Sequence, residues 1–298
     1  MTKPILSIGL PVYNGERYLS LAMESILSQS FSDFELILSD NASTDSTADI
    51  IKHYKNTDSR VKYFRNSQNI GASRNFNQTV ELASGDFFKW ASYDDLLSPT
   101  YLEECILLLQ DNPNLVLSHA KSQEINENGE FIATYDQYDR MRLRSPKPHQ
   151  RFYDLISIRH SCDLVFGIMP TALLKKTILI GSYPASDRVL LAELALRGEI
   201  GLIPKYLFLH RDHAMNTWNR WKKDPSRVYW YDTQIKATNP FQHWKLFKEF
   251  TNLIYRVDLP IKDKMLCAFQ LVRWPRAYWS GVRVWRLLLE DIQYAVKH

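Results

Sequence analysis

The sequence lacks several patterns that would each identify a class of protein. Its 298 residues include three cysteines, Cys105, Cys162 and Cys267, which are widely spaced and form no metal-ligand motif. This usage predicts buried thiols in a reducing cytoplasm. No apolar run approaches the roughly 20 residues that span a membrane, and the first residues lack the shape of a signal peptide. We therefore expect a folded cytoplasmic protein.

Glycine-rich phosphate loops are also missing. The turn after the first expected strand contains one glycine, Gly15, and neither a Gly-x-Gly-x-x-Gly motif nor a P-loop follows it. A dinucleotide site needs small residues there so that the backbone can approach the phosphates. The sequence therefore argues against a nicotinamide or flavin dinucleotide site and against a nucleotidyltransferase. A nucleotide would have to be held by side chains and a metal.

The positive charge lies toward the C-terminus. The chain has 37 Lys and Arg residues against 33 Asp and Glu, and residues 240–298 contain ten of the former and five of the latter. The rest of the chain is close to neutral. The change in composition predicts two parts, an α/β domain over residues 1–235 and a helical, basic and aromatic appendage over residues 236–298.

Strands and helices are expected to alternate through the first hundred residues. This order is typical of an α/β fold with a doubly wound, mostly parallel sheet, in which ligands bind where the strands end. The loops 11–14, 40–43 and 92–95 each follow a strand, so we expect them to meet at one edge of the sheet. The expected strands cover residues 4–12, 34–39, 61–64 and 87–91, the expected helices cover residues 16–29 and 46–55, and residues 69–83 are expected to form a glycine-led loop followed by a helix.

Two adjacent carboxylates, Asp94 and Asp95, follow the buried aromatic strand over residues 87–91. Paired acids at a strand end are suited to a hard divalent cation, which prefers oxygen ligands and often shares them with phosphates. The alternative is a polar turn before the next helix.

Five segments together resemble glycosyltransferase family 2. They are residues 7–16 (SIGLPVYNGE), 25–45 (ending in SDNASTD), 69–75 (NIGASRN), 83–86 (ASGD) and 93–95 (YDD). The order and spacing match the family up to about residue 100, and a weaker match resumes between about 180 and 215. The resemblance implies the GT-A fold, a Rossmann-like, mixed and mostly parallel sheet flanked by helices, and an inverting enzyme that uses a nucleotide sugar.

The resemblance also implies roles for individual residues. Tyr13 would stack on the nucleotide base, Asp40 would accept a hydrogen bond from a ring N–H such as uracil N3, and Asp95 would bind the metal that bridges the diphosphate. Asp187 stands at the position of the family's catalytic base. The implied nucleotide-sugar residues are Pro11, Tyr13, Asn14, Asp40, Arg74, Asp94 and Arg211, the metal residues are Asp95 and His213, and the catalytic residue is Asp187.

Each of these residues also has an ordinary structural interpretation. Tyr13 could be a core aromatic, Asp40 could cap the helix that it precedes, and Arg74 could be a solvated helix residue. Asp187 could be a first-turn acid of the helix over residues 188–197. The family often has a further acid where this chain has Ser92, so the expected metal site has fewer carboxylates.

Two segments of the second half leave alternatives open. Residues 126–150 are polar and predict a hairpin turn followed by a mobile loop, which could be an acceptor lid or a surface excursion. In residues 240–298, aromatic residues recur at helical spacing and alternate with arginine, as in the run that begins at Arg273. This pattern is typical of a membrane-interface helix, but a helix packed on the domain gives the same apolar stripe. Nothing in it indicates nucleic-acid binding.

We therefore expect an inverting glycosyltransferase that moves a sugar from a UDP-sugar, or another nucleotide sugar, to a saccharide or lipid-linked acceptor. Asp187 would be the general base, and Mn²⁺ or Mg²⁺ would be the cofactor. The C-terminal helices would either pack on the domain or make a peripheral contact with the inner face of the membrane. The alternative is a catalytically silent scaffold with the same fold, which the presence of all the acids disfavours.

Overall fold

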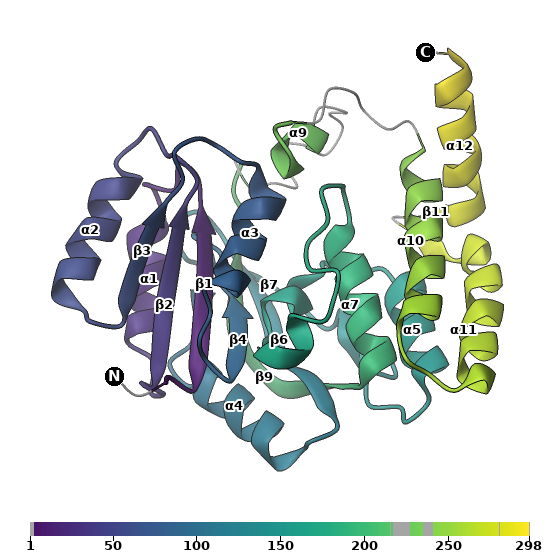
Figure 1. The fold of residues 1–298 in the computed structure, drawn as a ribbon, viewed down its shortest axis with the longest axis horizontal. Coiled ribbons are helices and arrows are strands. Elements are labelled where there is room, and N and C mark those ends of the chain that lie inside the picture. Colours follow the sequence, from purple (N-terminus) through teal and green to yellow (C-terminus); the bar gives the residue numbers. More distant parts are fainter. Residues whose placement is uncertain (1–2, 215, 217–226, 235–240, 280, 298) are drawn as a thin grey trace.

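The computed structural model describes residues 3–214, 216, 227–234, 241–279 and 281–297. Its centre is a nine-stranded sheet in the order β3-β2-β1-β4-β8-β6-β9-β5, with β7 paired to β6 (Figure 1). The strands are β1 (Leu6–Val12), β2 (Phe34–Asp40), β3 (Val61–Arg65), β4 (Phe87–Trp90), β5 (Leu96–Leu97), β6 (Leu115–Ile125), β7 (Phe131–Tyr135), β8 (Ile168–Pro170) and β9 (Glu199–Arg211).

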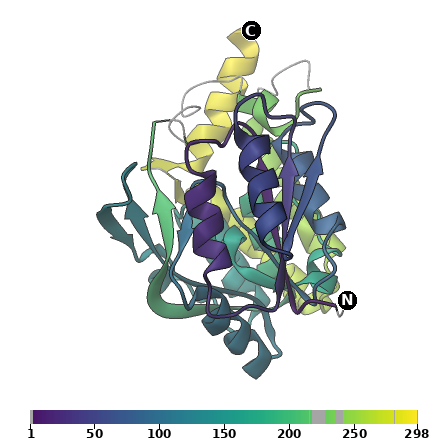
Figure 2. The same ribbon diagram turned by 90° about the vertical axis from the view of Figure 1, so that its left-hand side faces the viewer.

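Helices cover both faces of this sheet. In Figure 2, α1 and α2 lie in front of the first strands. The α-helices are α1 (Leu19–Leu27), α2 (Thr47–Thr57), α3 (Ala72–Glu81), α4 (Tyr101–Asp111), α5 (Pro148–Ser157), α6 (Thr171–Leu174), α7 (Ser186–Arg197), α9 (Arg227–Tyr231), α10 (Gln242–Arg256), α11 (Ile261–Arg273) and α12 (Val284–Lys297). Short 3₁₀ turns are η1 (Gln137–Arg140), η2 (Asp163–Phe166) and η3 (Trp274–Arg276), and β10 (Tyr278–Trp279) pairs with β11 (Val282–Arg283).

The expected α/β class with a mixed, mostly parallel sheet is confirmed. The first four strands pair in parallel, and β6 pairs in parallel with β9. Strand β8 runs antiparallel to both of its neighbours, β4 and β6. With three residues, β8 is too short to show a periodic pattern, so it could not be predicted from the sequence.

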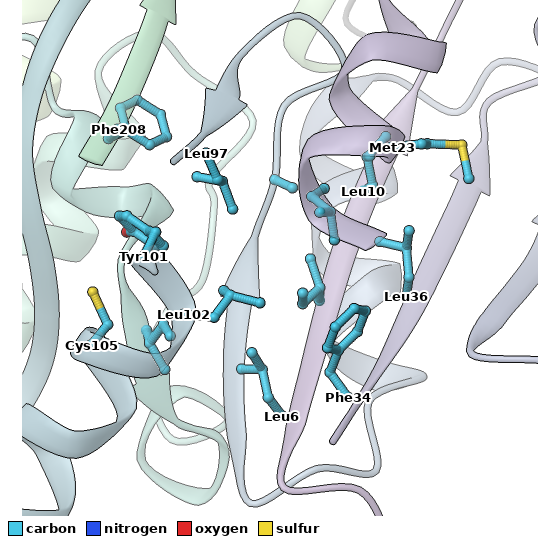
Figure 3. Packing of buried hydrophobic residues seen from close by; sticks show 14 of the residues in the cluster. Leu6, Leu10, Met23, Phe34, Leu36, Leu97, Tyr101, Leu102, Cys105 and Phe208 are labelled. Atoms are coloured by element: carbon cyan, nitrogen blue, oxygen red, sulfur yellow. The ribbon is translucent and has the colours of Figure 1, made fainter. Parts of the chain in front are cut away.

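Two apolar layers hold the helices on the sheet. Strands β1 and β2 are buried along their whole length, which is the pattern of parallel strands covered on both faces. Figure 3 shows the layer beneath α1 and α4, where Leu10, Met23 and Leu36 meet and Leu102 packs nearby. The other layer lies beneath α3 and α7. On that side a Cβ at Gly9 would lie 2.4 Å from Thr79 Oγ1, so the glycine allows α3 to approach β1 closely.

The C-terminal helices pack on the domain. Helices α10, α11 and α12 share an apolar cluster with α5 and α7, centred on Phe250 and Trp274 (Figure 1). This confirms the helical character expected for the appendage and one of the two interpretations of its apolar stripes. The expected boundary at 235/236 lies outside the described residues, and the division into two parts stays a prediction.

The segment over residues 126–150 is more ordered than the sequence suggested. Its hairpin is confirmed, because β7 pairs antiparallel with β6. The remainder is not a plain surface excursion, since Tyr138, Met141 and Leu143 are buried in the apolar layer beneath α7. Three anchoring side chains hold this stretch against the domain, which is the opposite of what the polar composition indicated.

Lys89 on β4 is fully buried, and its ammonium donates a hydrogen bond to the carbonyl of Phe166 and lies over the rings of Tyr101 and Phe208. Burial lowers the pKa of Lys89 to about 7. Because the pKa of Lys89 is lower in the folded protein than in the unfolded chain, burying this lysine reduces the free energy of unfolding. The reduction is complete below about pH 7, and it disappears as the pH rises toward 10.5, the ordinary pKa of lysine.

We therefore expect Lys89→Met to raise the melting temperature at pH 7, with a gain that shrinks as the pH approaches 10. Melting curves across this range check it. Lys55→Met, which replaces an exposed lysine of α2, is the control and should show no such trend. A gain that stays constant with pH would contradict the assignment of a neutralised lysine.

Candidate functional site

The loops that follow β1 and β2 are hydrogen-bonded to each other, as the parallel sheet predicted. The backbone N–H of Asn14 donates to Ser43 Oγ at 3.0 Å, and the Asn14 side chain accepts from the N–H of Thr44 at 2.9 Å. Asn14 has a positive φ of 52°, which asparagine tolerates better than most residues. Pro11 lies near the end of β1, and Tyr13, the first residue after this strand, is 45% exposed. Tyr13 is therefore not a core aromatic, and its ring is available for stacking on a base.

Asp40 is fully buried at the end of β2. Its Oδ1 accepts the N–H of Ser43 at 2.8 Å, and its Oδ2 accepts the hydroxyl of Tyr63 at 2.9 Å. It is not the N-cap of α2, whose N-cap is Ser46. Instead it stabilises the turn that holds the two loops together. Asp40 has no exposed surface, and both of its oxygens already accept hydrogen bonds within the protein, so its role in base recognition stays a prediction.

Arg74 projects from the first turns of α3 toward the segment that follows α9. Its guanidinium donates to Gln234 Oε1 at 2.8 Å and lies 3.7 Å from Asp232 Oδ2. This segment passes so close to α3 that a Cβ at Gly71 would lie 2.7 Å from the carbonyl oxygen of Tyr231. Figure 1 shows α9 beyond the upper end of α3. Arg74 is therefore held by Asp232 and Gln234, and it is not simply a helix residue exposed to solvent.

Asp94 and Asp95 follow β4 and form the centre of a compact cluster. Asp94 accepts a hydrogen bond from Ser92 Oγ through Oδ1, and its Oδ2 lies 2.9 Å from His213 Nε2. Asp95 Oδ1 accepts the backbone N–H of Arg211 at 2.9 Å and lies 3.1 Å from His210 Nδ1. Both carboxylates are largely buried. His210 near the end of β9 and His213, two residues after it, thus each face one of the paired acids.

Arg211 was predicted to be a nucleotide-sugar residue, and a phosphate is the part of that ligand that an arginine would contact, but the structure places its side chain inside the protein. Its Nε donates to the carbonyl of Asp94 at 2.9 Å, and one of its terminal nitrogens donates to the carbonyls of Asn126 and Glu127 at 3.0 and 3.1 Å. The guanidinium also lies 4.8 Å from the ring centre of Tyr18. Arg211 is 1% exposed, so it fixes the position of the Asp94 backbone, and phosphate contact stays a prediction.

Because one guanidinium serves three carbonyls, lysine is a poor substitute at this position. Arg211→Lys is expected to destabilise the protein by about 1–3 kcal/mol, the cost of leaving buried acceptors unpaired. Urea unfolding measures this. The control is Arg17→Lys, which changes an exposed arginine that pairs with Glu127 of the same hairpin and should cost much less. Equal losses in the two variants would contradict the role given to Arg211.

A divalent cation fits the oxygen donors of the cluster. Asp95 Oδ2 has no hydrogen bond from any described residue, and a carboxylate oxygen with substrate phosphates is a common way to hold Mg²⁺ or Mn²⁺. Among the described residues, no group of three or more His, Cys, Asp or Glu side chains is arranged to hold a metal by itself. A cation here would therefore depend on diphosphate oxygens. His213 Nε2 faces Asp94, so ligation by His213 stays a prediction.

His210 was not singled out from the sequence, although its Nδ1 lies 3.1 Å from Asp95 Oδ1. Burial alone would lower the pKa of His210, but the charge of Asp95 and its hydrogen bond raise that pKa to about 9. A protonated His210 then balances the charge of Asp95. The sequence shows four candidate residues in a row, from His210 to His213, and no signal tells which of them face the acids.

Asp187 lies in the first turn of α7, after Ala185, which has a positive φ of 62°. Its Oδ1 accepts the N–H of Arg188 at 2.8 Å, and the thiol of Cys162 is a second partner. Burial raises the pKa of Asp187 above its ordinary value, more than these hydrogen bonds lower it. A raised pKa is common among general bases, but burial raises the pKa of a structural acid in the same way, so the catalytic role of Asp187 stays a prediction.

The structure thus brings some of the predicted residues together and leaves others apart. Asp94, Asp95, Arg211 and His213 form one hydrogen-bonded cluster, and the loops that contain Asn14 and Asp40 form a second group. Arg74 pairs with the segment after α9. Within the described part of the chain, no hydrogen bond or ion pair joins Asp187 to any of the other predicted residues.

Comparison with known proteins gives a consistent result. The family model described as "Glycosyl transferase family 2" matches residues 7–173, more than half of the chain. An uncharacterized glycosyltransferase of Methanocaldococcus jannaschii is 27% identical over 258 residues, which are 86% of this chain and 84% of that protein. An uncharacterized glycosyltransferase of Haemophilus influenzae is 38% identical over 119 residues, 40% of this chain and 47% of that protein. The chain thus matches about half the length of the second relative.

Solved structures share the fold. The Staphylococcus aureus protein TarS, residues 1–349 in complex with UDP, superposes with a TM-score of 0.65 at 19% identity, over 90% of this chain and 71% of that chain. The mannosyltransferase PcManGT of Pyrobaculum calidifontis, in complex with GDP-Man and Mn²⁺, gives a TM-score of 0.56 at 15% identity, over 100% of this chain and 87% of that chain. At these identities the likeness shows the fold alone.

Proposed function

Because the chain belongs to glycosyl transferase family 2 and has the GT-A fold of glycosyltransferases, we propose that it is an inverting hexosyltransferase that uses a UDP-sugar. The observation that carries this proposal is the cluster of Asp94, Asp95 and the end of β9. It joins segments more than a hundred residues apart at the edge of the sheet where the parallel strands end, the place at which α/β sheets bind ligands.

The donor would lie along this edge. Tyr13 would offer its exposed ring to the base, and the loops fixed by Asn14 and Asp40 would shape the pocket around it. Asp95 would hold a Mn²⁺ or Mg²⁺ ion together with the diphosphate, and a bound cation would offset the charge that grows on the leaving group. Asp94, fixed by Ser92 and His213, would contact the ribose or the metal.

Asp187 would act on the acceptor. Its carboxylate would take the proton of the acceptor hydroxyl as that oxygen attacks the anomeric carbon, opposite the departing nucleoside diphosphate. Its raised pKa makes it a stronger base than an exposed aspartate. Inversion rests on the family resemblance, and Asp187 lies outside the residues that the family model matches.

We also propose that the acceptor is a saccharide or a lipid-linked group in polysaccharide biosynthesis, and that the protein works in the cytoplasm with a peripheral contact to the membrane. None of the helices in the described ranges is long and apolar enough to cross a bilayer. The alternative is a silent scaffold with the same fold, which would neither bind a nucleotide sugar nor transfer the sugar.

Calorimetric titration with UDP tests the donor site. We expect UDP to bind more tightly when Mn²⁺ is present, since the cation joins the diphosphate to Asp95. Equal affinity with and without Mn²⁺ would contradict the metal site, and no binding under either condition would favour the scaffold.

A further inference from the structure

We propose that helix α11 docks on an anionic lipid surface through four exposed apolar side chains, Ile261, Met265, Phe269 and Val272. Their exposed fractions are 76, 68, 59 and 71%. The spacing of four, four and three residues places them along one side of the helix. The opposite side carries Cys267 and Leu271, which are buried in the cluster with α5 and α10. The helix therefore packs with one apolar face and presents a second one to solvent.

The outward position of this face is clear in the fold. Helix α11 lies at the outer edge of the molecule, at the end opposite α2 (Figure 1). Tyr255, at the end of α10, is 75% exposed and lies beside α11, because Lys264 donates to its carbonyl at 3.0 Å. An exposed aromatic side chain next to an apolar stripe is typical of a helix at the membrane interface.

Charge decides which partner fits this face. Helical geometry places Lys262 and Arg273 on one flank of the stripe and Lys264 on the other flank. The helix has one acid, Asp263, on the side away from the stripe, where its charge acts on His149 and Arg151 of the neighbouring helix. The exposed face of α11 is therefore apolar with cationic flanks, the pattern that binds anionic lipid head groups.

A second copy of this chain fits the same face poorly. A two-fold dimer brings identical surfaces together, so the cationic flanks of one copy would meet those of the other. Like charges that face each other across an interface cost free energy. A lipid surface avoids this cost and supplies the opposite charge.

The docking face is connected to the candidate base through packed helices. Helix α11 packs on α5, and α5 packs on α7, whose first turn contains Asp187. A protein held by α11 would keep α7 at a fixed position relative to the lipid surface. The use of this arrangement for a lipid-linked acceptor rests on the proposed function, whereas lipid binding itself does not.

Vesicle flotation tests the proposal on the full chain. Vesicles of phosphatidylcholine alone are compared with vesicles that also contain phosphatidylglycerol. We expect the protein to float with the anionic vesicles and to remain behind with the neutral ones. The double variant Met265→Ser and Phe269→Ser should lose flotation, and Lys262→Gln should weaken partitioning about fivefold, since each cation near an anionic surface contributes roughly that factor.

The matched control is the double variant Leu107→Ser and Phe131→Ser, which removes two exposed apolar side chains of α4 and β7 and should float like the wild type. Equal flotation of the α11 variant and the wild type would overturn the proposal, and so would no flotation of the wild type. A wild-type dimer in sedimentation that the α11 variant abolishes would assign the face to a second copy instead. UDP affinity is measured on the same samples. Failed flotation with intact UDP binding would contradict only the docking of α11 on lipid. Absent UDP binding would contradict the proposed function.

Discussion

Replacing Asp187 with asparagine is expected to slow sugar transfer by about 10²–10⁴-fold, the usual contribution of a general base. Asparagine keeps the shape of the side chain and still accepts the N–H of Arg188, so donor affinity and melting temperature should change little. The measurement is single-turnover transfer, together with UDP-sugar affinity and a melting curve on the same preparation.

The pH dependence of transfer gives a second readout for Asp187. A base must be deprotonated to act, so the rate should fall as the pH drops through the pKa of this carboxyl. Because burial raises that pKa, the fall should begin above the ordinary range of an aspartate. The control is Asp49→Asn, which changes an exposed first-turn acid of α2 and should leave the rate unchanged. Near-normal turnover in Asp187→Asn would remove the catalytic role and leave the nucleotide site standing.

Replacing Asp95 with alanine is expected to abolish the part of UDP binding that depends on Mn²⁺. Both carboxylate oxygens of the neighbouring Asp94 already have partners in Ser92 and His213, whereas Asp95 Oδ2 has no hydrogen bond from the described residues, so the loss of Asp95 should have the larger effect on the metal. UDP titration of the variant with and without Mn²⁺ should then give the same weak affinity.

Two comparisons separate this effect from loss of structure. Asp111→Ala changes an exposed acid at the end of α4 and should retain metal-dependent binding. Asp95→Asn keeps the acceptor for the N–H of Arg211 but carries no charge, so it should retain the fold and lose most of the metal effect. If Mn²⁺ still strengthened UDP binding to Asp95→Ala, another group would have to be the ligand.

The sequence predicted the first half of the site because parallel strands impose a simple geometry. Asn14, Asp40 and Asp95 each follow a buried strand, and strands that run in the same direction end at the same edge. The structure confirms the strands and the contact between the loops after β1 and β2. Position in sequence was enough to predict these features.

Burial and long-range pairing could not be predicted in the same way. Whether Asp40 faces a ligand or the interior depends on Tyr63, which comes from another strand. The pairing of Arg211 with Asp94 depends on how β9 lies along β6, where the register shifts at three points. A one-residue shift turns a side chain to the other face of a sheet, so no pattern in the sequence distinguished His210 from Arg211.

The C-terminal helices show both interpretations of one apolar pattern. Phe250 and Ile254 of α10 are buried against the domain, whereas Met265 and Phe269 of α11 are exposed. Helical spacing identifies an apolar face but not the surface that covers it. Only the packing of α11 on α5 showed that the exposed stripe is a second face of the same helix.

The most direct test of the central claim is a panel of nucleotide sugars, incubated with the protein with and without Mn²⁺ and assayed for release of the nucleoside diphosphate. We predict metal-dependent release of UDP from at least one UDP-sugar by the wild type, and no such release by Asp95→Ala. Release that is the same in both proteins, or no release from any donor by the wild type, would contradict the assignment of a metal-assisted glycosyltransferase site at Asp94 and Asp95.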